Sequence, residues 1–310
     1  MPDHSPSLTS LPVAGLSNDT RGMLLGLAGV AIFSLTLPFT RLAVRELDPT
    51  LVAFGRALVA AFLAGCWLWW RGAALPPRSA LRPLAAVALG CVLGFPWLTS
   101  MAMRTLPASH GAVLVGILPL TTAVWAALLG RERPSPGFWI VALAGSALTV
   151  GFALRQGGGS LHGADALMLL ALLLGGLGYA EGGRLAQSLG GQQVISWSLL
   201  LAAPVALVIV LSMLVQGWLR HAALPSAGPA AWLGLAYVSV FSMFIGFFFW
   251  YRGMALGGVA RVGQTQLLQP FLSLAGAAVL LGEPLAAAQW GFAAAVIVLV
   301  ALGRMMRVRR

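Results

Sequence analysis

Polar side chains that could bind a solute interrupt long apolar segments of the chain. These amides and hydroxyls are Ser34, Thr36, Tyr179, Gln264, Gln266 and Gln269. Gln266 and Gln269 are three residues apart, so on a helix they share one face. Amides and hydroxyls both donate and accept hydrogen bonds, and they favour a cavity for a polar solute. Hydrogen bonding between helices, or back to the helix itself, is the alternative.

Aromatic side chains lie in the same kind of segment. Trp97, Phe244 and Phe248 are available for contact with the apolar part of a solute. Packing within the protein core is the alternative for each ring. Together with the amides, these rings predict a cavity for a neutral or zwitterionic amphipathic solute.

Charged and titratable side chains fall toward the ends of the apolar segments. Arg56 and the pair Glu181 and Arg184 are expected to snorkel or to pair locally. His110 is expected at the membrane interface, and a gating or proton role for His110 and Glu181 is the alternative. No Asp or Glu falls near the middle of a segment. The sequence therefore predicts no carboxylate relay and no sodium site.

Pro119 and Pro270 lie inside two apolar segments that are expected to be helical. A proline deprives the carbonyl four residues earlier of its helical partner, and these carbonyls belong to Val115 and Gln266. In lipid such a group must meet protein, water or a solute. The two prolines therefore predict either simple kinks or a paired gating role.

Catalysis, cofactors and metals are not expected. The sequence contains neither a Gly-x-Ser-x-Gly elbow nor a His-Glu-x-x-His motif. Cys66 and Cys91 stand singly in apolar segments, without the spacing of a metal site or a disulfide framework. An intramembrane enzyme would need a nucleophile and a base within hydrogen-bond reach, and His110 is the one histidine in a predicted span.

The elements that position these residues are predicted to be membrane helices. Of 310 residues, 59% are hydrophobic and 9% charged, whereas soluble domains are roughly a quarter charged. A helix needs about twenty apolar residues to cross the hydrocarbon core. Ten segments reach that length: 21–43, 51–70, 83–103, 110–129, 136–154, 164–185, 194–217, 229–252, 261–281 and 287–303. The predicted fold class is all-α and integral to the membrane.

Arginines predict the orientation of these helices, because basic residues near helix ends are retained in the cytoplasm. Thirteen arginines fall on the side that holds both termini and five on the other. Both termini are therefore expected in the cytoplasm, residues 1–20 as a disordered tail and residues 304–310 as a basic tail. The net charge of +11 follows this pattern and does not indicate nucleic-acid binding.

The chain also contains an internal repeat. A shift of 151 residues aligns Met103 with Met254, Pro119 with Pro270, Glu132 with Glu283 and Trp139 with Trp290. The repeats are predicted at 21–155 and 156–303, with five helices each, and an odd number inverts the second copy in the membrane. Glu132 and Glu283 are expected to cap the helices that follow them. Inverted repeats are the architecture expected of alternating-access carriers.

Pairs of glycines four residues apart recur along the chain. They are Gly22 and Gly26, Gly90 and Gly94, Gly178 and Gly182, and Gly253 and Gly257. Small residues let membrane helices approach closely, so packing is the expected role and a hinge is the alternative.

Across residues 21–303 the sequence resembles the EamA-type exporters of the drug/metabolite transporter superfamily. The resemblance is carried by Leu129-Gly130-Arg131-Glu132-Arg133-Pro134, by Gln269-Pro270 and by Leu281-Gly282-Glu283-Pro284-Leu285. Arg56 looks like an arginine often seen early in the family's second helix. The resemblance implies ten helices in two repeats and a central cavity bounded by helices 1, 3, 4, 6, 8 and 9. Within the family, the sequence is most like the exporters of aromatic amino acids.

The expected function is export of small amphipathic metabolites, aromatic amino acids among them, across a bacterial-type inner membrane. The substrate-binding residues are predicted to be Ser34, Thr36, Trp97, Tyr179, Phe244, Phe248, Gln266 and Gln269. Gating or structural roles are predicted for His110, Pro119, Glu181 and Pro270. A nucleotide-sugar or lipid-linked carrier of the same fold is the alternative. The expected partners are a small solute and the lipid bilayer, with a single chain as the unit.

Overall fold

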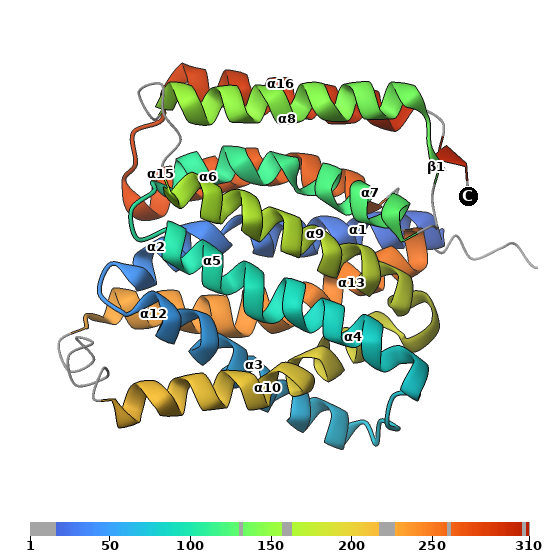
Figure 1. Ribbon diagram of the computed structural model, residues 1–310, viewed down its shortest axis with the longest axis vertical. Helices are drawn as coiled ribbons and strands as arrows, with labels where there is room; N and C mark the ends of the chain where they lie inside the picture. The colour runs from blue at the N-terminus through green and yellow to red at the C-terminus, as the bar shows by residue number, and fades with distance from the viewer. Residues whose placement is uncertain are drawn as a thin grey trace, which may run out of the picture.

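The computed structural model describes residues 17–129, 133–156, 163–216, 227–258, 262–305 and 308–309, and most of these residues are helical. The helices lie side by side in one bundle with their ends at two opposite sides (Figure 1). By length and composition, seven helical stretches could cross a membrane: Asn18–Val44, Pro49–Trp70, Arg78–Ala102, Ala108–Leu128, Gly163–Leu189, Gly191–Val215 and Pro229–Gly257. Two shorter apolar stretches are Thr265–Leu281 and Ala287–Leu299.

Three of the long stretches are single helices: α3 (Pro49–Trp70), α9 (Gly163–Leu189) and α10 (Gly191–Val215). The start of α3 follows from its sequence. Pro49 occupies the first turn, and the Asp48 carboxylate accepts the backbone N–H groups of Thr50 and Leu51 at 2.7 and 3.2 Å. Gly190 joins α9 to α10 with φ +86°, a backbone conformation that would be strained for a residue with a side chain.

The other long stretches are interrupted near their middle. The first consists of α1 (Asn18–Ser34) and α2 (Thr36–Val44), which meet at Leu35. Two contain a π-helical segment, in which the turn is wider than in an α-helix. The segment η2 (Ala88–Gly94) lies between α4 (Leu81–Val87) and α5 (Phe95–Ala102), with the short η1 (Arg78–Ala80) ahead of α4. The segment η4 (Val238–Ile245) lies between α12 (Pro229–Tyr237) and α13 (Gly246–Gly257).

Both mid-segment prolines follow a 3₁₀ turn. The turn η3 (Val115–Ile117) links α6 (Ala108–Leu114) to α7 (Leu118–Leu128), and η5 (Gly263–Leu268) precedes α15 (Gln269–Leu281). Pro119 and Pro270 lie in the first turns of α7 and α15, where a backbone N–H would have no partner within the helix, so its absence in proline loses no hydrogen bond. The expectation of unpaired carbonyls is wrong. In the 3₁₀ turns each of these carbonyls accepts a hydrogen bond from the backbone N–H three residues later. Leu118 donates to Val115, and Gln269 donates to Gln266.

The glycine pairs bring the backbones of two helix pairs together. Helix α1 packs on α13, and a Cβ on Gly22 would lie 2.5 Å from the backbone nitrogen of Gly257. In the same way η2 packs on α9, where a Cβ on Gly90 would lie 2.4 Å from the carbonyl oxygen of Leu174. Real Cβ atoms are not found at such distances from backbone, so the expected packing role of these glycines is confirmed.

Helices α8 (Pro136–Gln156) and α16 (Ala287–Met305) lie side by side at one edge of the bundle (Figure 1). A small apolar cluster joins them to α6 and α15, and its buried members are Ala112, Val113, Phe152, Leu274 and Ala293. The two-residue strands β1 (Arg133–Pro134) and β2 (Val308–Arg309) pair antiparallel beside this edge.

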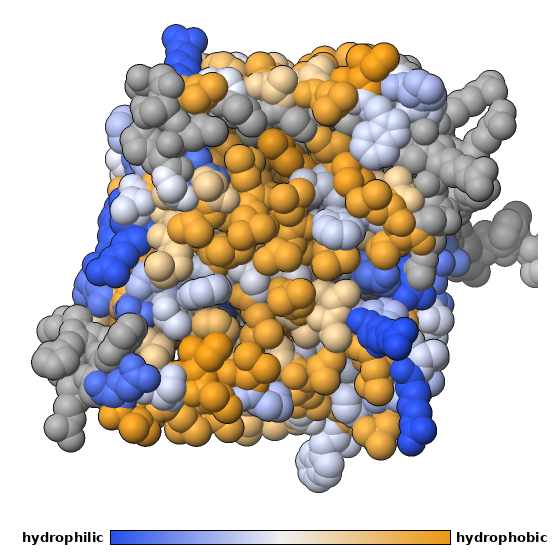
Figure 2. All heavy atoms as spheres, viewed as in Figure 1, coloured by the Kyte–Doolittle hydropathy of each residue, from blue (hydrophilic) through white to orange (hydrophobic). Residues whose placement is uncertain are grey.

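The outer surface of the bundle is apolar along the middle of the helices. Figure 2 shows hydrophobic side chains across the centre of the visible face, and most of the strongly hydrophilic ones lie near the helix ends. Exposed large hydrophobic residues include Phe62, Trp69, Val205, Val208, Leu211 and Val215 on α3 and α10. Water would not favour so large an apolar surface, whereas the hydrocarbon core of a bilayer does.

Candidate functional site

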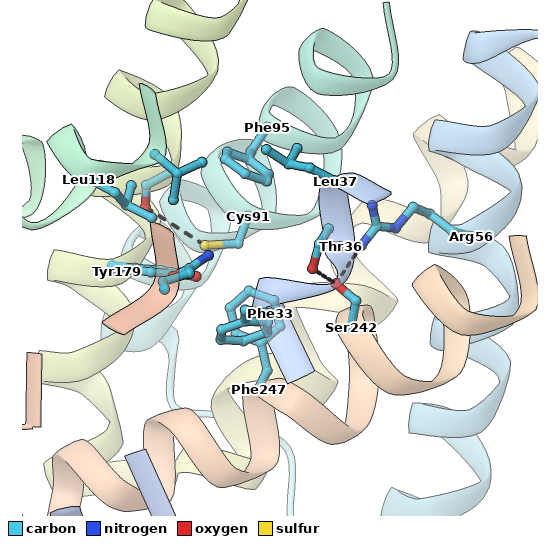
Figure 3. Close-up of a pocket in the computed structure, with 13 residues that line it drawn as sticks. Phe33, Thr36, Leu37, Arg56, Cys91, Phe95, Leu118, Tyr179, Ser242 and Phe247 are labelled. Carbon is cyan, nitrogen blue, oxygen red and sulfur yellow. Dashed lines mark hydrogen bonds between the residues drawn. The ribbon is translucent and has the colours of Figure 1, made fainter. Parts of the chain in front are cut away.

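A pocket lies among the helices where their interruptions occur (Figure 3). Its empty volume is about 480 Å³, part of which is open to solvent. The lining residues are Phe33, Thr36, Leu37, Arg56, Cys91, Phe95, Val115, Leu118, Gly175, Tyr179, Ser242, Phe247 and Gln269. Five of the seven contributing stretches are irregular at this level, at Leu35 and in or beside η2, η3, η4 and η5. No described residue of α8 or α16 lines the pocket.

Arg56 is the charged side chain of the pocket, and only 2% of it is exposed. Its Nη2 donates to Ser242 Oγ at 3.0 Å, and that oxygen lies 2.8 Å from Thr36 Oγ1 (Figure 3). Its Nε and Nη1 have no hydrogen-bond partner within the described chain. The expectation that Arg56 snorkels or pairs locally is wrong, because α3 turns this face toward the neighbouring helices and away from the bundle surface.

Aromatic rings form another part of the pocket wall. Phe33 lies edge-on to Phe247 with ring centroids 4.9 Å apart, and it stacks with Tyr179 at 6.3 Å. Tyr179 and Phe247 meet edge to face at 6.0 Å. Gln269, the first residue of α15, adds a buried carbonyl oxygen, Oε1, without a partner in the described chain. The pocket thus combines an apolar wall with polar groups, as sites for small amphipathic molecules do.

Three of the residues predicted to bind the solute line this pocket: Thr36, Tyr179 and Gln269. Trp97 does not line it. It is 41% exposed and lies beside Phe54, with ring centroids 6.1 Å apart. Ser34 is buried, and its hydroxyl donates to the Val30 carbonyl at 2.7 Å.

The remaining predicted binding residues also lie outside the pocket lining. Phe244 and Phe248 contact each other at 4.4 Å between ring centroids, and Phe248 packs edge-on to Trp67 at 5.1 Å. Gln266 is 4% exposed, and its Nε2 has no partner in the described part of the chain. The side chain of Gln264 lies outside what the structure describes.

His110 contacts a carboxylate, and Glu181 forms an ion pair. Glu181 accepts two hydrogen bonds from Arg184, at 3.0 Å from Nε and 2.8 Å from Nη2, which confirms the expected local pair. His110 Nε2 lies 2.7 Å from Asp165 Oδ1, and both side chains are buried. The carboxylate comes from α9, 55 residues further along the chain, and both residues lie in the first turns of their helices. The expected interfacial depth of His110 stays a prediction.

Glu283 caps a helix, but not the one that follows it. Its two carboxylate oxygens accept the backbone N–H groups of Ala108 and Ser109 at 2.9 and 2.8 Å, at the start of α6. A carboxylate at a helix N-terminus satisfies free amides and complements the helix dipole. The cap therefore joins the two halves of the chain. Glu132, the counterpart of Glu283 in the predicted repeat, lies outside the described residues.

An all-helical bundle with an apolar exterior and a pocket among its helices defines a multi-pass membrane protein. The family model described as "EamA-like transporter family" matches residues 20–152 and again residues 162–304. The chain therefore belongs to the EamA-like transporter family. Within the described residues, no three His, Cys, Asp or Glu side chains gather as metal ligands would.

Relatives and a solved structure agree with this assignment. A Bacillus subtilis (strain 168) protein described as "Uncharacterized transporter YdeK" is 47% identical over 289 residues, which are 93% of this chain and 99% of that protein. An Archaeoglobus fulgidus protein described as "Uncharacterized transporter" is 29% identical over 118 residues, 38% of this chain and 40% of its own. A solved structure, "Crystal structure of protein", superposes with a TM-score of 0.62 at 21% identity. That superposition covers 92% of this chain and 96% of the other and shows a shared fold.

These findings make the chain a membrane transporter of the EamA family and not an enzyme. They also make it a multi-pass protein of the plasma membrane.

Proposed function

We propose that the protein exports small amphipathic metabolites, aromatic amino acids among them, by alternating access. The observation that carries this proposal is the pocket, which combines the rings of Phe33, Tyr179 and Phe247 with the polar groups of Arg56 and Gln269. An amino acid with an aromatic side chain presents the complementary groups. A single chain is the proposed transporting unit.

The proposed architecture has ten spans in two inverted repeats, with both termini in the cytoplasm. In addition to the seven long stretches, the spans would be α8, η5 with α15, and α16. The family model matches each half of the chain separately, which supports a repeat. The irregular segments recur as well. The shift of 151 residues carries η2 onto η4 and η3 onto the end of η5, so the helices are interrupted at equivalent places.

The helix contacts support alternating access in particular. The contact of α1 with α13 has its counterpart in that of α5 and η2 with α9, and glycines lie in both interfaces. Two similar halves can exchange conformations, which opens the pocket first to one side of the membrane and then to the other.

A nucleotide-sugar or lipid-linked carrier is the second candidate, but no specific observation favours it. Such a solute carries phosphate charges and requires several fixed cations. Among the described residues that line the pocket, Arg56 is the single cation.

The proposed orientation can be tested with single cysteines at positions 45 and 78, which are exposed in the structure. Native Cys66 and Cys91 would first be replaced by alanine. A thiol reagent that does not cross membranes should label Arg45→Cys in intact cells and Arg78→Cys only after permeabilisation, because arginine-rich ends stay in the cytoplasm. Labelling of position 78 in intact cells would contradict the proposed orientation and indicate the opposite one. Position 220 is expected outside and position 307 inside, and both lie beyond the described residues.

Counterflow in proteoliposomes tests the function itself. Purified protein would be assayed with labelled phenylalanine, tryptophan, leucine and a panel of drugs. We expect saturable counterflow without an imposed ion gradient, since no described carboxylate lines the pocket. Absence of counterflow for the whole panel would count against the proposed substrates. Strict dependence on a proton gradient would contradict the uncoupled mechanism, and His110 and Asp165 would then be the first groups to replace.

A further inference from the structure

The guanidinium of Arg56 is a buried charge without a counter-charge. Its side chain is 2% exposed, and no described Asp or Glu forms a salt bridge with it. A buried ion is strongly unfavourable unless another charge and hydrogen bonds compensate it. Inside a membrane protein, such an isolated charge indicates a function. Among the described residues, the hydroxyl of Ser242 accepts a hydrogen bond from Arg56, but it supplies no negative charge.

Arg56 lines the pocket and has two donor nitrogens without partners among the described residues. One guanidinium nitrogen is held by Ser242, while Nε and Nη1 lack partners among the described residues. Figure 3 shows the Arg56 side chain extending from α3 toward Thr36 and Ser242. A carboxylate is planar, and its two oxygens match the donors of a guanidinium better than any neutral group does.

The rest of the pocket is suited to the remainder of such a solute. Gln269 Oε1 is an acceptor without a partner in the described chain, and it can receive a hydrogen bond from an ammonium or amide N–H. The rings of Phe33, Tyr179 and Phe247 provide apolar surface. The pocket therefore offers one group for each end of such a solute. Arg56 can bind an anionic group, and Gln269 can bind a hydrogen-bond donor.

We propose that Arg56 binds the carboxylate of the transported solute, so that the protein accepts organic acids and zwitterions and rejects their uncharged and cationic analogues. This inference rests on the proposed function and makes its substrate class specific. Replacing a carboxylate with an amide removes the ion pair while it preserves the size of the solute. We expect the amide to bind at least about tenfold more weakly than the acid, because removing a hydrogen bond to a charged group typically lowers affinity by more than that factor.

A purely structural role for Arg56 makes a different prediction. In that case the bond from Arg56 to Ser242 would hold α3 against η4, and the charge of the solute would not matter. The variant Ser242→Ala removes that bond and keeps the guanidinium. It should therefore retain the preference for the acid if Arg56 binds the solute.

The experiment compares matched acid and amide pairs on the purified full-length protein in detergent. The probes are phenylalanine with phenylalaninamide, leucine with leucinamide, and benzoate with benzamide. Thermal unfolding is followed at increasing probe concentration, because a ligand that binds the folded state raises Tm. For wild type we expect at least one acid to raise Tm and its amide to require at least ten times the concentration. Arg56→Gln should lose the response to the acid, and Arg56→Lys should weaken it.

Three outcomes would overturn the carboxylate site. They are equal responses to acid and amide, a full acid response in Arg56→Gln, or no response of wild type to any acid. The wild-type comparison needs no variant and stands even if Arg56→Gln fails to fold. Counterflow separates this inference from the proposed function. Transport of amides as well as acids would refute the site alone, whereas acid binding without any counterflow would refute transport of these solutes alone.

Discussion

Replacing Gly253 by valine is expected to abolish accumulation of the folded protein in the membrane. A Cβ at this position would lie 2.8 Å from both the Gly22 carbonyl oxygen and the Gly26 nitrogen. Both atoms belong to the backbone of α1, so α1 and α13 would have to separate along their whole contact. Overpacking of a core usually costs about 1–3 kcal/mol through side-chain adjustment, and a backbone clash cannot be relieved in that way. Size-exclusion chromatography of a fluorescent fusion from membranes measures the effect.

Gly65→Val is the matched control. A Cβ at Gly65 in α3 has Leu200 Cδ2 as its nearest neighbour, at 3.6 Å, which is ordinary van der Waals contact. This variant should give a monodisperse peak near the wild-type level. Gly90→Val, at the equivalent interface of η2 with α9, should behave like Gly253→Val. A normal peak for Gly253→Val would show that the backbones of α1 and α13 are not in contact.

Helix positions could be predicted well wherever composition alone decides them. The segment predicted at 51–70 corresponds to Pro49–Trp70, and the one at 194–217 to Gly191–Val215. Hydropathy identifies such segments because the bilayer requires an apolar length. It does not report the hydrogen-bond pattern inside the segment. The π-helical segments and the break at Leu35 therefore could not be predicted, although they surround the pocket.

For Arg56, position along the helix gave the wrong prediction because the sequence does not show directly which face of the helix turns toward the other helices. Its place near the start of the span predicted snorkelling, yet the side chain is buried in the pocket. A usable signal lay in the alanines of the same helix. Ala53, Ala57, Ala60 and Ala64 are all buried, and Ala53 and Ala60 share a helical face with Arg56. A stripe of small residues beside a charge indicates that the charge faces other helices and not lipid.

Long-range partners could not be predicted from one sequence. The contact of His110 with Asp165 joins α6 and α9, and Glu283 caps α6 from the other half of the chain. Neither pair has a local spacing that would reveal it. Trp97 does not line the pocket, and the reason is related. It follows the π-helical segment, whose wider turn shifts the direction of later side chains relative to a regular helix.

Gln269→Leu is expected to reduce transport strongly at normal expression. Gln269 lines the pocket and its Oε1 has no partner in the described chain, so a solute donor can bind there. Leucine keeps the approximate volume and removes the acceptor, which leaves the donor of the bound solute unsatisfied. Such a loss costs about 1–3 kcal/mol, or roughly 5- to 150-fold in apparent affinity. Concentration dependence of counterflow gives the change, and solutes that lack the donor should be affected least.

Gln266→Leu and Trp97→Ala are the controls for this prediction. Gln266 lies one helical turn earlier than Gln269 and is equally buried, but it does not line the pocket. Trp97 is a large ring that is 41% exposed and does not line the pocket. Both variants should transport with nearly wild-type kinetics, because neither removes a group that the solute can reach. If both lost transport at normal expression while Gln269→Leu kept it, the solute would bind elsewhere in the bundle, and the polar groups of this pocket would serve helix packing.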